Sequence, residues 1–158
     1  MKSNIFISGV IGAVLLFGAF TCQAEKWDKS GFVDEKIETS YYNISSIKVK
    51  GKVVSWTEKY ILKSDAATTL TTALSLHQAC KQNIEKMGNV TQYQQDYQIE
   101  KGKFRGVAKR YYNEASKLIC TNKDTGDEYK TVWNDILRGS PMQQAQYDLV
   151  TKYKVKFP

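Results

Sequence analysis

Hydrophobic and polar positions alternate most clearly between Val53 and Leu62. A period of two, carried by β-branched and aromatic residues, is typical of a strand with one buried face. An extended segment, Tyr41–Val49, precedes it, and Gly51 lies between the two, so the pattern predicts a β-hairpin. One face of the second strand holds Val54, Trp56, Glu58, Tyr60 and Leu62, and the other holds Ser55, Thr57 and Lys59, with Val53 and Ile61 at its ends.

The middle and the end of the chain show weaker alternation. Short polar and glycine-containing segments separate the extended runs, as turns do between antiparallel strands. We expect a strand over 90–99, a turn over 100–103, extended chain with a bulge at Gly106 over 104–120, a turn over 122–127 and a last strand over 129–136.

The segment Ser64–Met87 permits two interpretations. Its apolar residues fall near helical spacing, and Gly88 is suited to end a helix. Leu74, Leu76 and Cys80 also share one face of a strand, and four threonines between Thr68 and Thr72 disfavour a helix. Periodicity alone does not decide between helix and strand here.

A helix is predicted near the C-terminus. Ser140 has the side chain of an N-cap, Pro141 suits the first helical position, and Gln143 lies three residues after the cap, as a capping box requires. Several strands followed by a terminal helix predict an α+β fold. We expect a single small domain in which a largely antiparallel sheet packs against this helix. The helix's apolar stripe consists of Met142, Ala145, Leu149, Val150 and Tyr153.

The N-terminus has the three parts of a secretory signal peptide. Lys2 supplies positive charge, an apolar run covers 5–20, and small or polar residues occupy 21–24. We therefore expect residues 1–24 to be removed and residues 25–158 to form the exported domain, in the periplasm or at the cell surface. Two alternatives remain open, a retained anchor helix and attachment to the membrane through lipidation of Cys22.

Cleavage or lipidation at this point leaves two cysteines, Cys80 and Cys120. An even number in an oxidising compartment predicts a disulfide, and two free buried thiols are the alternative. The bond would close a loop of about 40 residues and stabilise the domain by about 4 kcal/mol in the chain-entropy model.

The composition of the chain indicates which classes of partner it could bind, and its motifs indicate which catalytic functions are disfavoured. The chain carries a net charge of +7, and the predicted signal peptide holds one lysine and no acid, so the remainder carries +6. This charge favours membrane surfaces, polyanions or acidic protein patches, and nucleic acid is the weakest candidate for an exported protein. A catalytic triad would have to use His77, and no catalytic, metal-binding or cofactor-binding motif is present, so we expect a non-enzymatic protein without a cofactor.

One stretch combines positive charge with tyrosine. Arginine and tyrosine are enriched at protein interfaces, so the stretch is a candidate surface for a protein or another anionic partner. The alternative is a solvated strand face with core aromatics behind it. The candidate residues are Lys101, Lys103, Arg105, Lys109, Arg110, Tyr111 and Tyr112.

Several landmarks resemble the surface-adhesin protein E-like family of small exported Gram-negative proteins. The segment 41–47, YYNISSI, is similar to a tyrosine-rich segment of that family, and 50–56, KGKVVSW, is similar to its hairpin. Cys80 falls where a core strand of the family often carries a cysteine. Trp27, Trp133 and Gly139-Ser140-Pro141, which leads into a helix with Tyr147, complete the resemblance.

The resemblance implies a fold and a class of function. It favours a strand within Ser64–Met87, and it implies a surface adhesin that contacts host or envelope proteins. The family's partner cysteine usually lies in the terminal helix near residues 149–151, where this chain has Thr151, so Cys120 would have to replace it from another element. A periplasmic inhibitor of a lytic enzyme is the alternative function, because such proteins are also small, exported and disulfide-bonded.

Overall fold

A computed structural model of the chain describes residues 25–31, 34–126 and 132–157. The predicted signal peptide, Cys22 and residues 129–131 of the strand expected over 129–136 lie outside the described residues. In the described remainder of that expected strand, strand pairing is confined to Asn134–Asp135. The elements are β1 (Trp27–Lys29), β2 (Ile37–Lys50), β3 (Val53–Leu62), α1 (Ser64–Leu74), α2 (Gln78–Met87), β4 (Gln92–Glu100), β5 (Lys103–Tyr112), β6 (Leu118–Thr121), β7 (Asn134–Asp135) and α3 (Pro141–Thr151).

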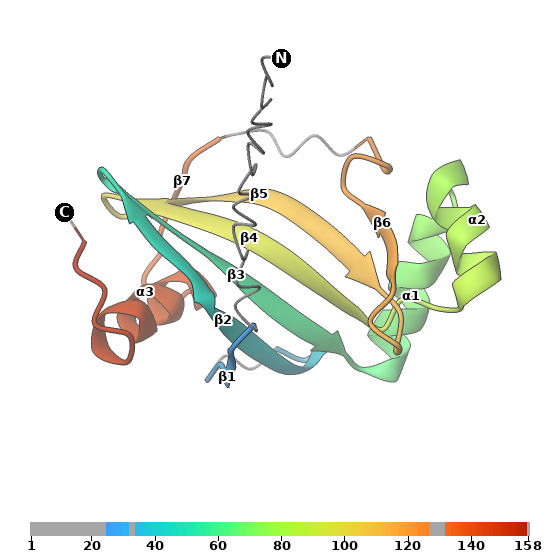
Figure 1. Cartoon of the computed structure of the whole chain (residues 1–158), viewed down its shortest axis with the longest axis horizontal. Helices are drawn as coiled ribbons and strands as arrows, with labels where there is room; N and C mark the ends of the chain where they lie inside the picture. The colour runs from blue at the N-terminus through green and yellow to red at the C-terminus, as the bar shows by residue number, and fades with distance from the viewer. Residues whose placement is uncertain (1–24, 32–33, 127–131, 158) are drawn as a thin grey trace, which may run out of the picture.

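All strand pairs are antiparallel, and β1 to β6 lie in the sheet in their order along the chain. The short β7 pairs with β5 near its start, through Lys103 and Phe104. Figure 1 shows α3 at one end of this sheet and the pair α1 and α2 at the other. The α+β class, the antiparallel sheet and the C-terminal helix are therefore confirmed.

Two tight hairpins set the register of the four long strands. The β2–β3 turn pairs Lys50 with Val53 and has Gly51 at φ 58°, in the left-handed region that glycine tolerates best. The β4–β5 turn has Lys101 at φ 47° and Gly102 at φ 77°. Two successive positive φ values match the right-handed twist of the flanking strands, which is why this turn joins them closely.

The strand favoured within Ser64–Met87 is wrong, because this segment forms the two helices α1 and α2. The threonines do not prevent α1. The hydroxyls of Thr68, Thr69 and Thr72 each donate to the backbone carbonyl four residues earlier, so these exposed side chains are satisfied within the helix. The helical spacing and the end of α2 at Gly88, with φ 88°, were correctly indicated by the sequence.

The cap of α3 forms as the sequence predicts. The Ser140 hydroxyl accepts a hydrogen bond from the Gln143 backbone N–H at 3.3 Å, and Pro141 occupies the first turn. The Gln143 side chain reaches back to the backbone N–H of Gly139, one residue before the cap, at 2.6 Å. Met142, Ala145 and Leu149 are buried against the sheet, whereas Val150 is exposed.

Two clusters of buried side chains join the helices to the same face of the sheet. The larger one joins α1 and α3 to the alternating residues of β3, including Trp56 and Tyr60. The smaller one joins Leu74 and Cys80 to Tyr111 and Ile119 near the other end of β5. We call the side of the sheet that these clusters occupy the helix face, and the opposite side the open face.

The sulfurs of Cys80 and Cys120 lie at disulfide distance, and their Cα atoms are 5.3 Å apart. The bond joins α2 to β6, so the pairing differs from one made through the terminal helix. It is compatible with an exported domain. Among the residues that the structure describes, no helix has the length and apolar character needed to cross a membrane.

Candidate binding surfaces on the two faces of the sheet

The strand register assigns each side chain of the long strands to one face. In β3, the residues of the open face are partly exposed at every second position, and those between them are buried on the helix face. Side chains that are directly opposite each other in neighbouring antiparallel strands share a face. The described part of the chain places no helix over the open face.

Cations lie in two cross-strand rows on the open face. The register aligns Lys29, Tyr41, Lys59, Gln94 and Arg110 in one row, and Lys48, Ser55, Gln98 and Arg105 in another. A row between them runs through Thr57 and Asp96. Asp96 is the one acidic side chain in these three rows, so positive charge predominates there.

Aromatic rings hold two of the cations in place. The Lys59 ammonium lies 4.3 Å from the centroid of the Trp27 ring and 5.1 Å from that of Tyr41. The Arg105 guanidinium lies 4.6 Å from the centroid of Trp133, and its Nε donates to Gln98 at 2.8 Å. Cation–π contacts of this kind restrict the side chains without neutralising their charge.

The third central cation is paired. Arg110 donates from both terminal nitrogens to the two carboxylate oxygens of Asp96, at 2.8 and 2.6 Å. The hydrogen bonds to Asp96 raise the pKa of Arg110, so it stays charged. Thr57 also donates to Asp96 at 2.7 Å, which fixes the carboxylate between β3 and β5.

The structure separates the basic and tyrosine-rich stretch of the sequence. A bulge at the pairs Tyr97–Gly106 and Asp96–Ala108 shifts the alternation, as was expected at Gly106. Lys101 lies in the exposed β4–β5 turn. Lys103, Arg105, Arg110 and Tyr112 are on the open face, whereas Lys109 and Tyr111 are on the helix face, where Tyr111 is buried.

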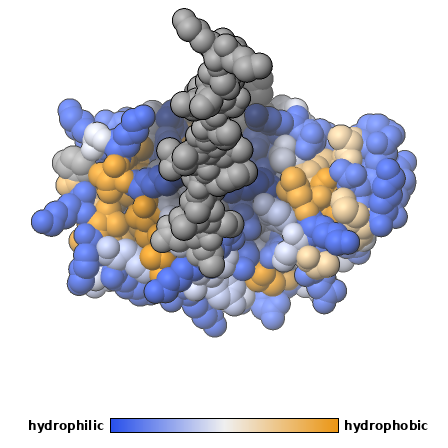
Figure 2. Space-filling model, viewed as in Figure 1, coloured by the Kyte–Doolittle hydropathy of each residue, from blue (hydrophilic) through white to orange (hydrophobic). Residues whose placement is uncertain are grey.

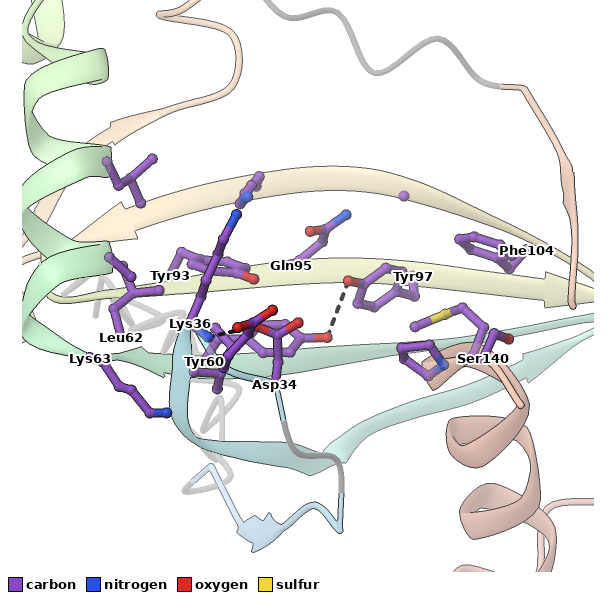
Figure 3. A pocket seen from close by; sticks show the side chains of 18 of the residues that line it. Asp34, Lys36, Tyr60, Leu62, Lys63, Tyr93, Gln95, Tyr97, Phe104 and Ser140 are labelled. Atoms are coloured by element: carbon purple, nitrogen blue, oxygen red, sulfur yellow. Dashed lines mark hydrogen bonds between the residues drawn. The ribbon is translucent and has the colours of Figure 1, made fainter. Parts of the chain in front are cut away.

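A groove crosses the helix face between α1 and α3. It has a volume of about 1340 Å³, and most of its lining comes from the segment 34–37, strands β3, β4 and β5, helices α1 and α3, and the segment 132–137. Figure 3 shows Tyr60, Tyr93, Gln95 and Tyr97 along the strands, with Leu62 near one end and Phe104 near the other. Sequence analysis did not single out these residues as a site.

A buried carboxylate supports the tyrosines of this groove. Glu58 accepts a hydrogen bond from Trp56 Nε1 at 2.7 Å and another from the Tyr60 hydroxyl. The Tyr60 hydroxyl is also 3.2 Å from that of Tyr97. Burial raises the pKa of Glu58 to about 7, against the opposing effect of its two hydrogen bonds, and burial also raises the pKa of Tyr60. The sequence signal was a lone acid on the buried face of an aromatic strand.

A second buried acid joins α3 to the sheet. Asp148 accepts a hydrogen bond from the Tyr42 hydroxyl at 3.2 Å, and Gln144 donates to its other oxygen at 2.9 Å. Burial raises the pKa of Tyr42, and the charges of Glu58 and Asp148 act in the same direction. This arrangement orients α3 and offers no acid–base pair to a substrate.

The remaining chemistry of the described residues is sparse. His77 lies between α1 and α2 and is not among the residues that line the groove. In the described part of the chain, no three His, Cys, Asp or Glu side chains gather into a metal-binding group.

In the view of Figure 2, hydrophilic residues cover most of the described surface, and hydrophobic residues gather in small separate groups. The geometry therefore offers two candidate binding surfaces, a cationic open face and a tyrosine-lined groove.

Comparisons with known proteins identify no relative, since no family model, no curated protein and no solved structure matches the chain.

Proposed function

We propose that this chain is an exported, non-enzymatic binding protein, and that an acidic surface of a host or envelope protein docks on the open face of its sheet. The observation that carries the proposal is the composition of that face: five cations and one acid in three cross-strand rows. The resemblance to the surface-adhesin protein E-like family supports the same class of function.

The arrangement suits protein recognition for two physical reasons. Trp27, Tyr41 and Trp133 present ring area beside the cations, and aromatic and arginine side chains supply most of the energy at protein interfaces. The contacts of Lys59 and Arg105 with these rings hold the cations before a partner arrives, which lowers the entropy lost on binding.

Charge reversal on the open face tests the proposal. The double variant Lys59→Glu/Arg105→Glu should weaken binding to immobilised extracellular-matrix proteins, and to poly-L-glutamate as a defined acidic probe, by about tenfold or more at low salt. The matched control Lys86→Glu/Lys123→Glu changes the net charge equally at exposed sites away from the rows and should bind normally. Equal binding by both variants would refute docking at this face.

The stretch identified in the sequence gives a second set of substitutions. Reversing Lys101, Lys103, Arg105 and Arg110 should also weaken binding, because at least three of the four lie on the open face. Lys109→Glu should not, because its side chain is on the helix face. A lysis-protection assay with the purified protein separates this proposal from inhibition of a lytic enzyme, which would protect cells without requiring Lys59.

A further inference from the structure

The groove on the helix face has the composition of a site for an amphiphilic ligand. Apolar side chains form both of its ends: Ala66 and Leu70 of α1 at one, and Phe104, Leu137 and Met142, which lies in α3, at the other. Small-molecule sites are typically concave and mostly apolar, with a few polar groups that fix the orientation of the ligand. The volume of about 1340 Å³ is large enough for a lipid-sized molecule.

The polar groups of the groove lie on the central strands between its apolar ends. The hydroxyls of Tyr60 and Tyr97 are 3.2 Å apart, and Gln95 lies beside Tyr97 in the groove. The Lys109 ammonium lies 4.0 Å from the centroid of the Tyr93 ring, which itself stacks on Tyr60 at 4.7 Å. Lys109 is the one charged residue that the central strands β3, β4 and β5 contribute to the described groove wall.

This distribution of charge selects a class of headgroup. None of the acids of the groove wall comes from the central strands, which contribute one cation and the phenol hydroxyls. These acids are Asp34 and Glu35 before β2, Asp65 in the first turn of α1 and Asp135 in β7. An anionic headgroup gains a charge-assisted hydrogen bond there, and a cationic one is repelled by Lys109. The adjoining alkyl and aromatic side chains favour a long apolar tail.

We propose that the groove binds a long-chain carboxylate, with its headgroup at Lys109 and the Tyr97 hydroxyl and its chain along one apolar wall. The proposal concerns the helix face and does not depend on docking at the open face.

A chain-length series tests the apolar part of the proposal. Titration of the natural protein with decanoate, dodecanoate and tetradecanoate below their micelle concentrations should give affinities that rise about tenfold for each two methylenes. Equal affinity across the series, or no binding at millimolar dodecanoate, would overturn the proposal.

Headgroup recognition is tested with probes of equal chain length. Dodecanoate should bind more tightly than dodecanol, and dodecyltrimethylammonium should bind least. Lys109→Met should reduce the preference for dodecanoate over dodecanol by about tenfold. Lys59→Met removes the corresponding ring-bound lysine of the open face and should leave it unchanged. Loss of the preference in Lys59→Met alone would contradict a headgroup site at Lys109.

Occupancy of the groove is tested by filling it. Ala73 is an exposed residue of α1 that lines the groove, so Ala73→Trp should block the site without disturbing the core. Ala79→Trp makes the same change at an exposed position of α2 outside the groove. Dodecanoate binding should fall more than tenfold in Ala73→Trp only, and undiminished binding by that variant would place the ligand elsewhere.

Discussion

The two faces of one sheet differ in how deeply their side chains are buried. On the helix face, β3 contributes Val54, Trp56 and Tyr60, all 5% exposed or less. On the open face, the neighbouring residues Ser55, Thr57 and Lys59 are partly exposed. Thr57 donates a hydrogen bond to Asp96, and Lys59 makes a cation–π contact with Trp27. Because alternate residues of one strand have such different surroundings, adjacent substitutions should have very different consequences.

The faces also treat charge differently. Glu58 is 3% exposed and retains only two donors, so its burial raises its pKa to about 7. Asp96, on the open face, accepts hydrogen bonds from both terminal nitrogens of Arg110 and remains accessible to solvent. The buried charge of Glu58 is thus costly to the folded state, whereas charge on the open face is available to a partner.

Replacing Trp56 should have the largest effect on stability. Its ring stacks on Tyr97 with centroids 5.5 Å apart, and its indole N–H is a donor to Glu58. Trp56→Ala leaves a cavity and removes that hydrogen bond, so it should lower the free energy of unfolding by about 3–5 kcal/mol. Lys59→Ala, three residues away, should cost about 1 kcal/mol or less. Urea denaturation of both variants measures the contrast, and similar losses would show that the two faces contribute equally.

Removing the disulfide between α2 and β6 should have the next largest effect on stability. Replacing both Cys80 and Cys120 with alanine removes the disulfide, which joins residues 40 positions apart in the chain. Because the unfolded chain then loses this constraint, the free energy of unfolding should fall by about 4 kcal/mol. Reducing agent should destabilise the parent protein similarly and leave the double variant unchanged. A parent insensitive to reductant would contradict this contribution.

Titration of Glu58 should make stability depend on pH. Its pKa is about 7 in the folded protein and about 4.5 in the unfolded chain, so the folded state holds this proton more tightly. The stabilisation is complete below about pH 4.5 and is lost as the pH rises through 7, with a total of about 3 kcal/mol. Glu58→Gln should remove this component. The difference in the free energy of unfolding between parent and variant, measured by denaturation from pH 4.5 to 8, should therefore change with pH. A difference that does not depend on pH would refute this contribution of Glu58.

Local patterns predicted the elements whose burial follows a simple period. The alternation of Val53–Leu62 gave β3 and its buried face, and the Ser140–Gln143 signature gave the start of α3. The helices of Ser64–Met87 were missed mainly because the family resemblance favoured a strand there, and because threonines disfavour an isolated helix. In α1, their hydroxyls find carbonyl partners, while Ala67 and Leu74 are buried against the sheet.

The binding surfaces were harder to predict because they depend on pairing between distant residues. Simple alternation along β5 places Arg105 and Lys109 on one face, and the bulge near Gly106 puts them on opposite faces. The contact between Tyr42 and Asp148 joins residues 106 positions apart, which no local pattern reports. The sequence therefore indicated a basic, aromatic surface without indicating which residues face the same way.

The cap of α3 should contribute modestly to the helix face. Ser140→Ala removes the acceptor for the Gln143 backbone N–H and should lower the free energy of unfolding by about 1 kcal/mol. Ser140→Asp keeps an acceptor and should restore the parent value. Thermal denaturation distinguishes the two variants. Equal melting temperatures for Ser140→Ala and the parent would show that the cap does not contribute to stability.

The ion pair of the open face should have the smallest effect on stability, although its geometry is bidentate. Arg110 and Asp96 each keep about 30% of their side-chain area exposed, so water and salt screen their attraction. Asp96→Asn should lower the free energy of unfolding by less than about 1 kcal/mol at low salt, and by less still at high salt. It also removes the one acid of the three rows, so binding to poly-L-glutamate should become tighter while stability barely changes. A large loss of stability in Asp96→Asn, or unchanged binding of the probe, would show that the pair stabilises the fold and does not limit binding. The charges of the open face can contribute to recognition only if they are not required to hold the sheet together.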